Sequence, residues 1–73
     1  MTIEDYRIRF GWSRKHMAAE AGIDVNTLRN AIAGKPIYRA KAGLITEAIN
    51  RELARRSESP ISYTDLDGIR FAD

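Results

Sequence analysis

A cluster of polar and cationic side chains lies between Val25 and Asn30. Side chains of these types can form hydrogen bonds with the edges of planar polar groups such as bases. Asparagine can bind adenine bidentately, arginine can bind guanine, and the methyl groups of valine and threonine can contact a thymine methyl. The candidates for such contacts are Val25, Asn26, Thr27, Arg29 and Asn30. Taken singly, the asparagines and the arginine are equally compatible with a solvated surface, so the elements that position them decide the interpretation.

Two short helices joined by a tight turn are expected between residues 13 and 34. Ser13 is typical of the N-cap of the first helix, and Trp12 and Met17 have the spacing of a hydrophobic staple. Gly22 suits the left-handed backbone that ends a helix and makes the turn. The sequence therefore predicts a hinged helix pair.

The second helix of this pair is placed at 24–33, with Asp24 as its N-cap and Gly34 directly after its end. Its apolar residues recur at spacings of three and four, and the expected buried stripe is Leu28, Ala31 and Ile32. The polar cluster then lies on the outer face. This arrangement suits a helix that enters the major groove of DNA.

Helix starts and flanking cations are expected to hold the phosphate backbone beside such a groove. The expected phosphate contacts are Ser13, Arg14, Lys15, Lys35, Tyr38 and Arg39. Tyr38 and Trp12 could instead pack in or at the edge of the core. His16 is expected to be solvated or to make a minor phosphate contact.

The positive charge of the chain is concentrated around the helix pair. Between Arg7 and Lys41 there are eight basic residues against two acidic ones, whereas residues 1–6 and 42–73 each carry a balance of −2. A polyanionic partner would therefore meet a basic face. The alternative is that the charged residues, which make up 30% of the chain, simply form an ordinary solvated surface.

The composition argues for one small domain and against several kinds of site. The 73 residues contain no cysteine and one histidine, so no metal centre, cofactor or small-molecule ligand is expected, and we predict no enzymatic activity. No apolar run approaches the roughly 20 residues that span a bilayer, and the N-terminal residues do not resemble a secretory signal. A cytoplasmic location is expected.

Two further helices complete the expected bundle within a domain at 1–56. The first follows Thr2, which with Asp5 has capping-box spacing, and ends at Gly11. The last begins at Ile37, after the break at Lys35-Pro36, and is predicted as one long helix with an apolar stripe. The residues of that stripe are Ile37, Ala40, Leu44, Ile45, Ala48, Ile49 and Leu53.

A C-terminal extension at 57–73 is expected to form two short strands. Residues 61–64 alternate in polarity, residues 69–71 follow, and Asp67-Gly68 is a good turn dipeptide between them. Because an isolated two-stranded hairpin is marginally stable, it should pack on the helices or pair with another chain. The residues assigned to dimerisation or tail packing are Ile61, Tyr63, Ile69 and Phe71.

Residues 13–34, and more loosely 2–53, resemble the lambda-repressor-like helix-turn-helix domains of phage repressors, Cro proteins and related bacterial regulators. The matching positions are Met17-Ala18, Gly22-Ile23, Leu28 and the closing Gly34. The sequence departs from the family at Ile32 and Ala33, where a glutamate or another polar residue is usual. We therefore expect fewer phosphate contacts from that helix end.

The resemblance implies a mainly α fold, with a compact bundle of four or five helices and here a short C-terminal β extension. It implies that helix 24–33 lies in the major groove and that a homodimer binds an inverted-repeat operator. By position, the base-reading residues it implies are Arg14, Val25, Asn26 and Arg29, supported by Thr27, Asn30 and Lys35.

The expected function is a sequence-specific double-stranded DNA-binding transcriptional regulator, of the phage or mobile-element repressor type, that acts by occupying an operator. Two alternatives keep DNA binding: a recombination-directing or architectural factor, and the DNA-binding subunit of an antitoxin. A third alternative is a protein-interaction module that has the same fold and does not bind DNA, because a fold alone does not fix a function.

Overall fold

Four α-helices carry most of the chain in the computed structural model, which describes residues 1–73. The helices are α1 (Ile3–Phe10), α2 (Arg14–Ala21), α3 (Val25–Ile32) and α4 (Arg39–Arg55). A short 3₁₀ helix, η1 (Tyr63–Asp65), and two strands, β1 (Pro36–Ile37) and β2 (Arg70–Phe71), complete the structure. The prediction of a mainly helical fold is confirmed.

The predicted helix caps are present at the first three helices. The Thr2 hydroxyl accepts from the Asp5 amide at 3.1 Å, while the Asp5 carboxylate accepts from the Thr2 amide at 2.8 Å. The Ser13 hydroxyl caps α2 by accepting from the His16 amide, and the Asp24 carboxylate caps α3 by accepting from the Asn26 amide. Each of these bonds satisfies an amide that has no partner inside its helix, which fixes where the helix begins.

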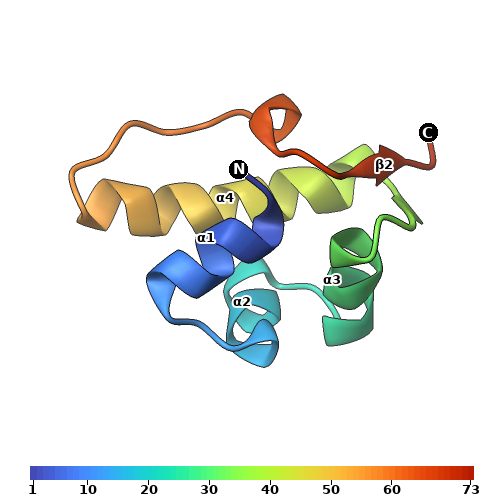
Figure 1. Cartoon of the computed structure of the whole chain (residues 1–73), viewed down its shortest axis with the longest axis horizontal. Helices are drawn as coiled ribbons and strands as arrows, with labels where there is room; N and C mark the ends of the chain where they lie inside the picture. Colours follow the sequence, from blue (N-terminus) through green and yellow to red (C-terminus); the bar gives the residue numbers. More distant parts are fainter.

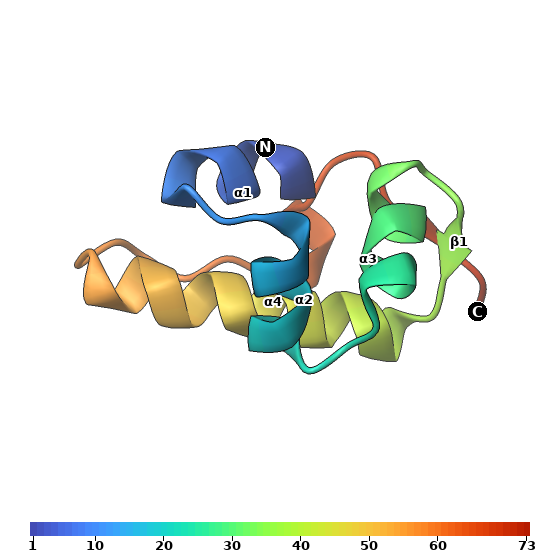
Figure 2. The same cartoon turned by 90° about the horizontal axis from the view of Figure 1, so that it is seen from below.

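A single hydrophobic core lies where α1, α2 and α3 meet one side of α4, as Figures 1 and 2 show. Its most deeply buried large side chains come from three different helices: Met17, Leu28, Ile45 and Ile49. Ala18 and Ala42 are also buried, and their small side chains allow α2 and α4 to approach closely.

The long helix α4 begins two residues later than predicted. Ile37 is buried in β1 rather than in a helix, and the helix starts at Arg39. The buried face is shifted accordingly, because Ala40 is exposed and Ala42 is buried. The helix continues through Gly43 without a break, since the packing of its apolar face outweighs the roughly 1 kcal/mol that a glycine costs.

The predicted hairpin between residues 61 and 71 is wrong. Residues 63–65 form η1, whose N-cap Ser62 and third residue Asp65 make a capping box. Only β2 is a strand, and it pairs in parallel with β1, with Pro36 opposite Arg70 and Ile37 opposite Phe71. A local helical cap thus competes successfully with strand formation, and the remaining strand pairs with a segment far away in the sequence.

The tail, defined as residues 57–73, packs on its own chain. Figure 1 shows it running back along α4, on the side away from α2 and α3. Leu66, in the segment predicted as a turn, is 6% exposed and belongs to the core. Asn50 on α4 holds the backbone of Ile61 through two hydrogen bonds, one donated by its side-chain nitrogen (2.9 Å) and one accepted by its side-chain oxygen (2.8 Å).

The four apolar residues assigned to dimerisation or tail packing lie within this tail. All four are partly buried against the core: Ile61, Tyr63, Ile69 and Phe71. Tyr63 and Phe71 meet edge to face, with ring centroids 5.8 Å apart. In this chain they serve tail packing.

Candidate nucleic-acid interface

The outer face of α3 carries the polar cluster that the sequence predicts. Asn26, Arg29 and Asn30 are exposed, while Val25 and Thr27 are half-buried at the helix start. The guanidinium of Arg29 donates to the side-chain oxygen of Asn26 over 3.4 Å, which is a long and weak hydrogen bond. These side chains therefore have hydrogen-bonding capacity left for a partner.

The turn between α2 and α3 fixes the direction of this face. Gly22 has a φ of 69°, and the amides of Gly22 and Ile23 bond back to carbonyls in the last turn of α2. Ile23 is partly buried and packs against the core. At the other end, the Lys35 amide bonds to the Asn30 carbonyl at 2.9 Å beyond Gly34, which has a φ of 78°. Both ends of α3 are thus held by left-handed glycine turns.

The cations of the chain divide into paired and unpaired groups. The arginines in salt bridges are Arg7, Arg9, Arg14, Arg39, Arg55 and Arg56, and the N-terminal ammonium and His16 also lie beside carboxylates. Arg51, which donates to the Glu20 backbone oxygen, and Arg70 form no salt bridge and lie outside the helix pair. Lys15, Arg29, Lys35 and Lys41 are exposed and form no salt bridge. These four lie on α2, on α3, after α3 and on α4. Their charge is therefore available to an external anion.

Arg14 is already engaged by a network that runs between α1 and α2. Its guanidinium donates to the Glu4 carboxylate at 3.1 Å. The same carboxylate accepts from Arg7, which also donates to the backbone oxygen of Trp12 at 2.8 Å. The hydrogen bond from Arg7, with a smaller contribution from Arg14, holds the pKa of Glu4 below its ordinary value against the opposing effect of burial. A base contact by Arg14 would require this ion pair to open.

Folding stability should depend on the ionisation of Glu4. A carboxyl whose pKa is lowered by folding stabilises the protein above its unfolded-state pKa, and this contribution is lost as the pH falls through the lowered value. We expect Glu4→Gln to lower the free energy of unfolding near pH 7 and to have a smaller effect at about pH 3, below the ordinary pKa of a glutamate. Urea unfolding of both proteins at the two pH values measures this, and an equal loss at both would contradict it.

Besides Arg14, two of the residues assigned to phosphate contacts already have partners within the chain. The Ser13 hydroxyl accepts from the His16 amide at 3.0 Å, as a cap. The Arg39 guanidinium lies 4.3 Å from the centre of the Phe71 ring and contacts Asp73. Lys15 and Lys35 have no such contacts.

The aromatic and imidazole side chains near the interface differ in how far they are buried. Trp12 is buried, with its ring 5.1 Å from that of Phe10, so the core-packing alternative for Trp12 is confirmed. Tyr38 is 61% exposed, and the packing alternative for Tyr38 is wrong. His16 is exposed, stacks on Trp12 at 4.9 Å and lies 3.3 Å from a Glu20 carboxylate oxygen.

Sequence reasoning did not find several residues that shape this surface. Asp73 acts through Arg39, 34 residues earlier, and Glu4 links Arg7, three residues further along α1, to Arg14 on α2. Asn50 and Leu66 hold the tail in place. The signal that could have revealed η1 was available, since Ser62 and Asp65 repeat the capping-box spacing found in the first helix.

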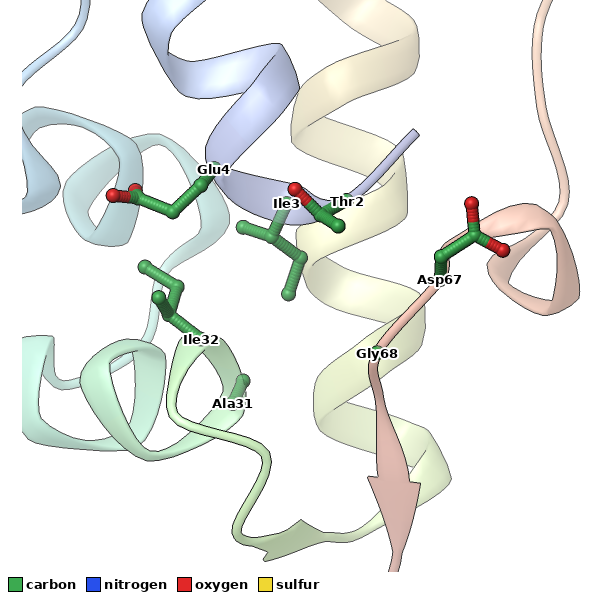
Figure 3. A pocket seen from close by; sticks show the side chains of 7 residues that line it. All are labelled: Thr2, Ile3, Glu4, Ala31, Ile32, Asp67 and Gly68. Carbon is green, nitrogen blue, oxygen red and sulfur yellow. The ribbon is translucent and has the colours of Figure 1, made fainter.

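A small cavity of about 100 Å³ lies between the start of α1, the end of α3 and the tail. Figure 3 shows Ile3, Ala31 and Ile32 grouped on one side of it, with Asp67 on the tail segment opposite. Pockets that hold small-molecule ligands measure about 300–1,000 Å³. This space is therefore better understood as a packing gap under the tail.

The other structural searches and the comparisons with known proteins give negative findings. No group of three or more histidine, cysteine or acidic side chains is arranged to hold a metal ion. None of the helices combines the length and the apolar character required to cross a membrane. Comparison with protein-family models, curated proteins and solved structures finds no match for this chain.

Proposed function

We propose that this chain is a sequence-specific double-stranded DNA-binding transcriptional regulator with a lambda-repressor-like helix-turn-helix fold, which acts by occupying an operator. The observation that carries the proposal is the outer face of α3. It presents exposed Asn26, Arg29 and Asn30, and exposed cations without salt bridges precede and follow α3 in the sequence, at Lys15 on α2 and at Lys35. Amide and guanidinium groups can bind base edges, and lysines without salt bridges can bind the phosphates beside them.

The dimensions of α3 suit this role. An α-helix with its side chains is about 10–12 Å across, and the major groove of B-DNA is about 12 Å wide, so the groove accepts one helix such as α3. The base-reading residues proposed are those on its outer face and first turn: Val25, Asn26, Thr27, Arg29 and Asn30. Binding would exchange the weak bond between Arg29 and Asn26 for stronger bidentate bonds to bases.

The phosphate contacts proposed come from side chains and from a helix start. Lys15 lies in the first turn of α2, where backbone amides add positive potential. Lys35 follows α3, and exposed Tyr38 precedes α4. Arg14 and Arg39 can join this set when they exchange their internal carboxylates for phosphates.

A homodimer on an inverted repeat is part of the proposal and rests on the family resemblance. The apolar tail residues already pack against their own core. A dimer that keeps this tail in place therefore needs a contact surface outside those side chains.

Lys35→Ala should weaken binding to all duplexes by the same factor. A lysine that contacts a phosphate carries no sequence information, and its loss lowers the slope of log affinity against log salt by about one. Fluorescence anisotropy with a preferred and a scrambled duplex over a salt series measures both effects. The matched control is Arg55→Ala, which removes a cation from the far end of α4 and should have a smaller effect. A loss confined to the preferred duplex would contradict the assignment.

A further inference from the structure

Residues 70–73 lie against the N-terminal end of α4. The Arg39 amide, which belongs to the first residue of that helix, donates to the Asp73 carboxylate at 3.1 Å. The Arg39 guanidinium donates to the backbone oxygen of Asp73 and lies 3.5 Å from the same carboxylate. One acidic residue thus meets both the helix start and the side-chain cation beside it.

The neighbouring residues place Asp73 in this position. β2 pairs with β1, and the Ala72 amide donates to the Ile37 carbonyl at 2.8 Å. The Phe71 ring lies under the Arg39 guanidinium at 4.3 Å from its centre. We call residues 70–73, with these contacts, the C-terminal latch.

The latch supplies an anion that α4 lacks locally. The N-cap residue Tyr38 makes no side-chain hydrogen bond to the helix, and the first turn of α4 contains no acidic residue. A helix start with free amides and an adjacent arginine favours either a carboxylate or a phosphate oxygen. Asp73 therefore has the charge and the hydrogen-bonding chemistry of the ligand that this position would otherwise accept.

We propose that the C-terminal latch is an autoinhibitory contact, in which Asp73 competes with a phosphate of the DNA backbone for Arg39 and the start of α4. This inference rests on the proposed function, because it concerns the phosphate contacts beside α3. When DNA binds, one of its phosphates replaces the Asp73 carboxylate at the start of α4. Because the contact with Asp73 must first be broken, the latch lowers the affinity of the chain for DNA.

The latch is suited to opening. The side chains of Arg39 and Asp73 are 47% and 48% exposed, and exposed ion pairs of this kind are weak. The strand that carries the latch has two residues, and Ala72 and Asp73 are both exposed. Leu66, which belongs to the core, lies before the latch in the sequence.

The test compares duplex binding by the wild type, Asp73→Asn and Glu47→Gln at a fixed moderate salt concentration. Glu47 is an exposed acid on the same helix without a salt bridge, so its variant controls for the loss of one negative charge. We expect Asp73→Asn to bind about three- to tenfold more tightly and to show a salt slope larger by about one. Glu47→Gln should change both quantities less.

Two additional measurements separate the possible outcomes. The gain from Asp73→Asn should be smaller in an Arg39→Ala background, where only the backbone amide of the Asp73 site remains, and thermal unfolding establishes that each variant is folded. Unchanged or weaker binding by folded Asp73→Asn, while the wild type binds duplex, overturns the latch alone. If neither protein binds any duplex, the proposed function fails and the latch fails with it.

Discussion

Arg29→Ala should weaken binding to the preferred duplex by about 1–3 kcal/mol and leave binding to a scrambled duplex almost unchanged. The side chain is exposed on the outer face of α3, and its only hydrogen bond within the chain is the 3.4 Å bond to Asn26. Removing it should therefore remove a base contact without disturbing the fold. Anisotropy titrations with the two duplexes, and with single base changes at each position, give the loss and its location.

Lys35→Ala is the matched comparison for this variant. Both changes remove one exposed cation without a salt bridge, but only Arg29 lies on the outer face of α3. We expect relaxed preference at one base position for Arg29→Ala and a uniform loss for Lys35→Ala. Equal losses on the preferred and scrambled duplexes for Arg29→Ala would show that it contacts the backbone and does not read a base.

Leu28→Ala should lower the free energy of unfolding by about 2–5 kcal/mol. Leu28 is completely buried at the centre of α3, where it anchors the helix to the core. Its truncation loses buried apolar surface and leaves a cavity. For a small domain, whose total stability is of the order of 5–15 kcal/mol, this is a large fraction. Chemical denaturation measured by circular dichroism provides the value.

The control for Leu28→Ala is Ile8→Ala. Ile8 lies on α1 and is 66% exposed, so its truncation removes a comparable amount of side chain without opening a cavity. We expect a change within about 0.5 kcal/mol. A loss below about 1 kcal/mol for Leu28→Ala would contradict the placement of α3 on the core.

The helices of the first half could be predicted because their ends are determined locally. Thr2, Ser13 and Asp24 cap the amides that follow them within three residues, and the left-handed glycines end the helices. These interactions depend on residues close in the sequence, so they are visible in its pattern. Helical spacing also predicted the buried Leu28 and Ala31 of α3, whereas Ile32, expected in the same stripe, is only partly buried.

The tail could not be predicted in the same way because its structure depends on distant partners. The strand β2 exists because β1, more than 30 residues earlier, offers a free edge. Leu66 is buried because the tail returns along α4. The alternation of apolar and polar residues at 61–64 does not indicate the course of the tail along this helix. The capping box at Ser62 was the only local sign that a helical turn would replace a strand.

The exposure of Asn26, Arg29 and Asn30 on α3 could be predicted, whereas the ion pairs formed by the neighbouring arginines could not. Helical spacing predicts which residues of α3 face outward. It does not predict the ion pairs of Arg14 with Glu4 and of Arg39 with Asp73, because these partners are 10 and 34 residues apart. A sequence pattern identifies which cations are present. It does not identify which of them are already neutralised by a carboxylate brought near by folding.

The most direct test of the account is selection of duplexes by the wild-type chain from a random library at moderate salt, followed by sequencing of the enriched pool. The account predicts enrichment of an inverted repeat whose halves lie about one helical turn apart. Binding without enrichment, which simply weakens as salt rises, would contradict sequence-specific recognition by α3.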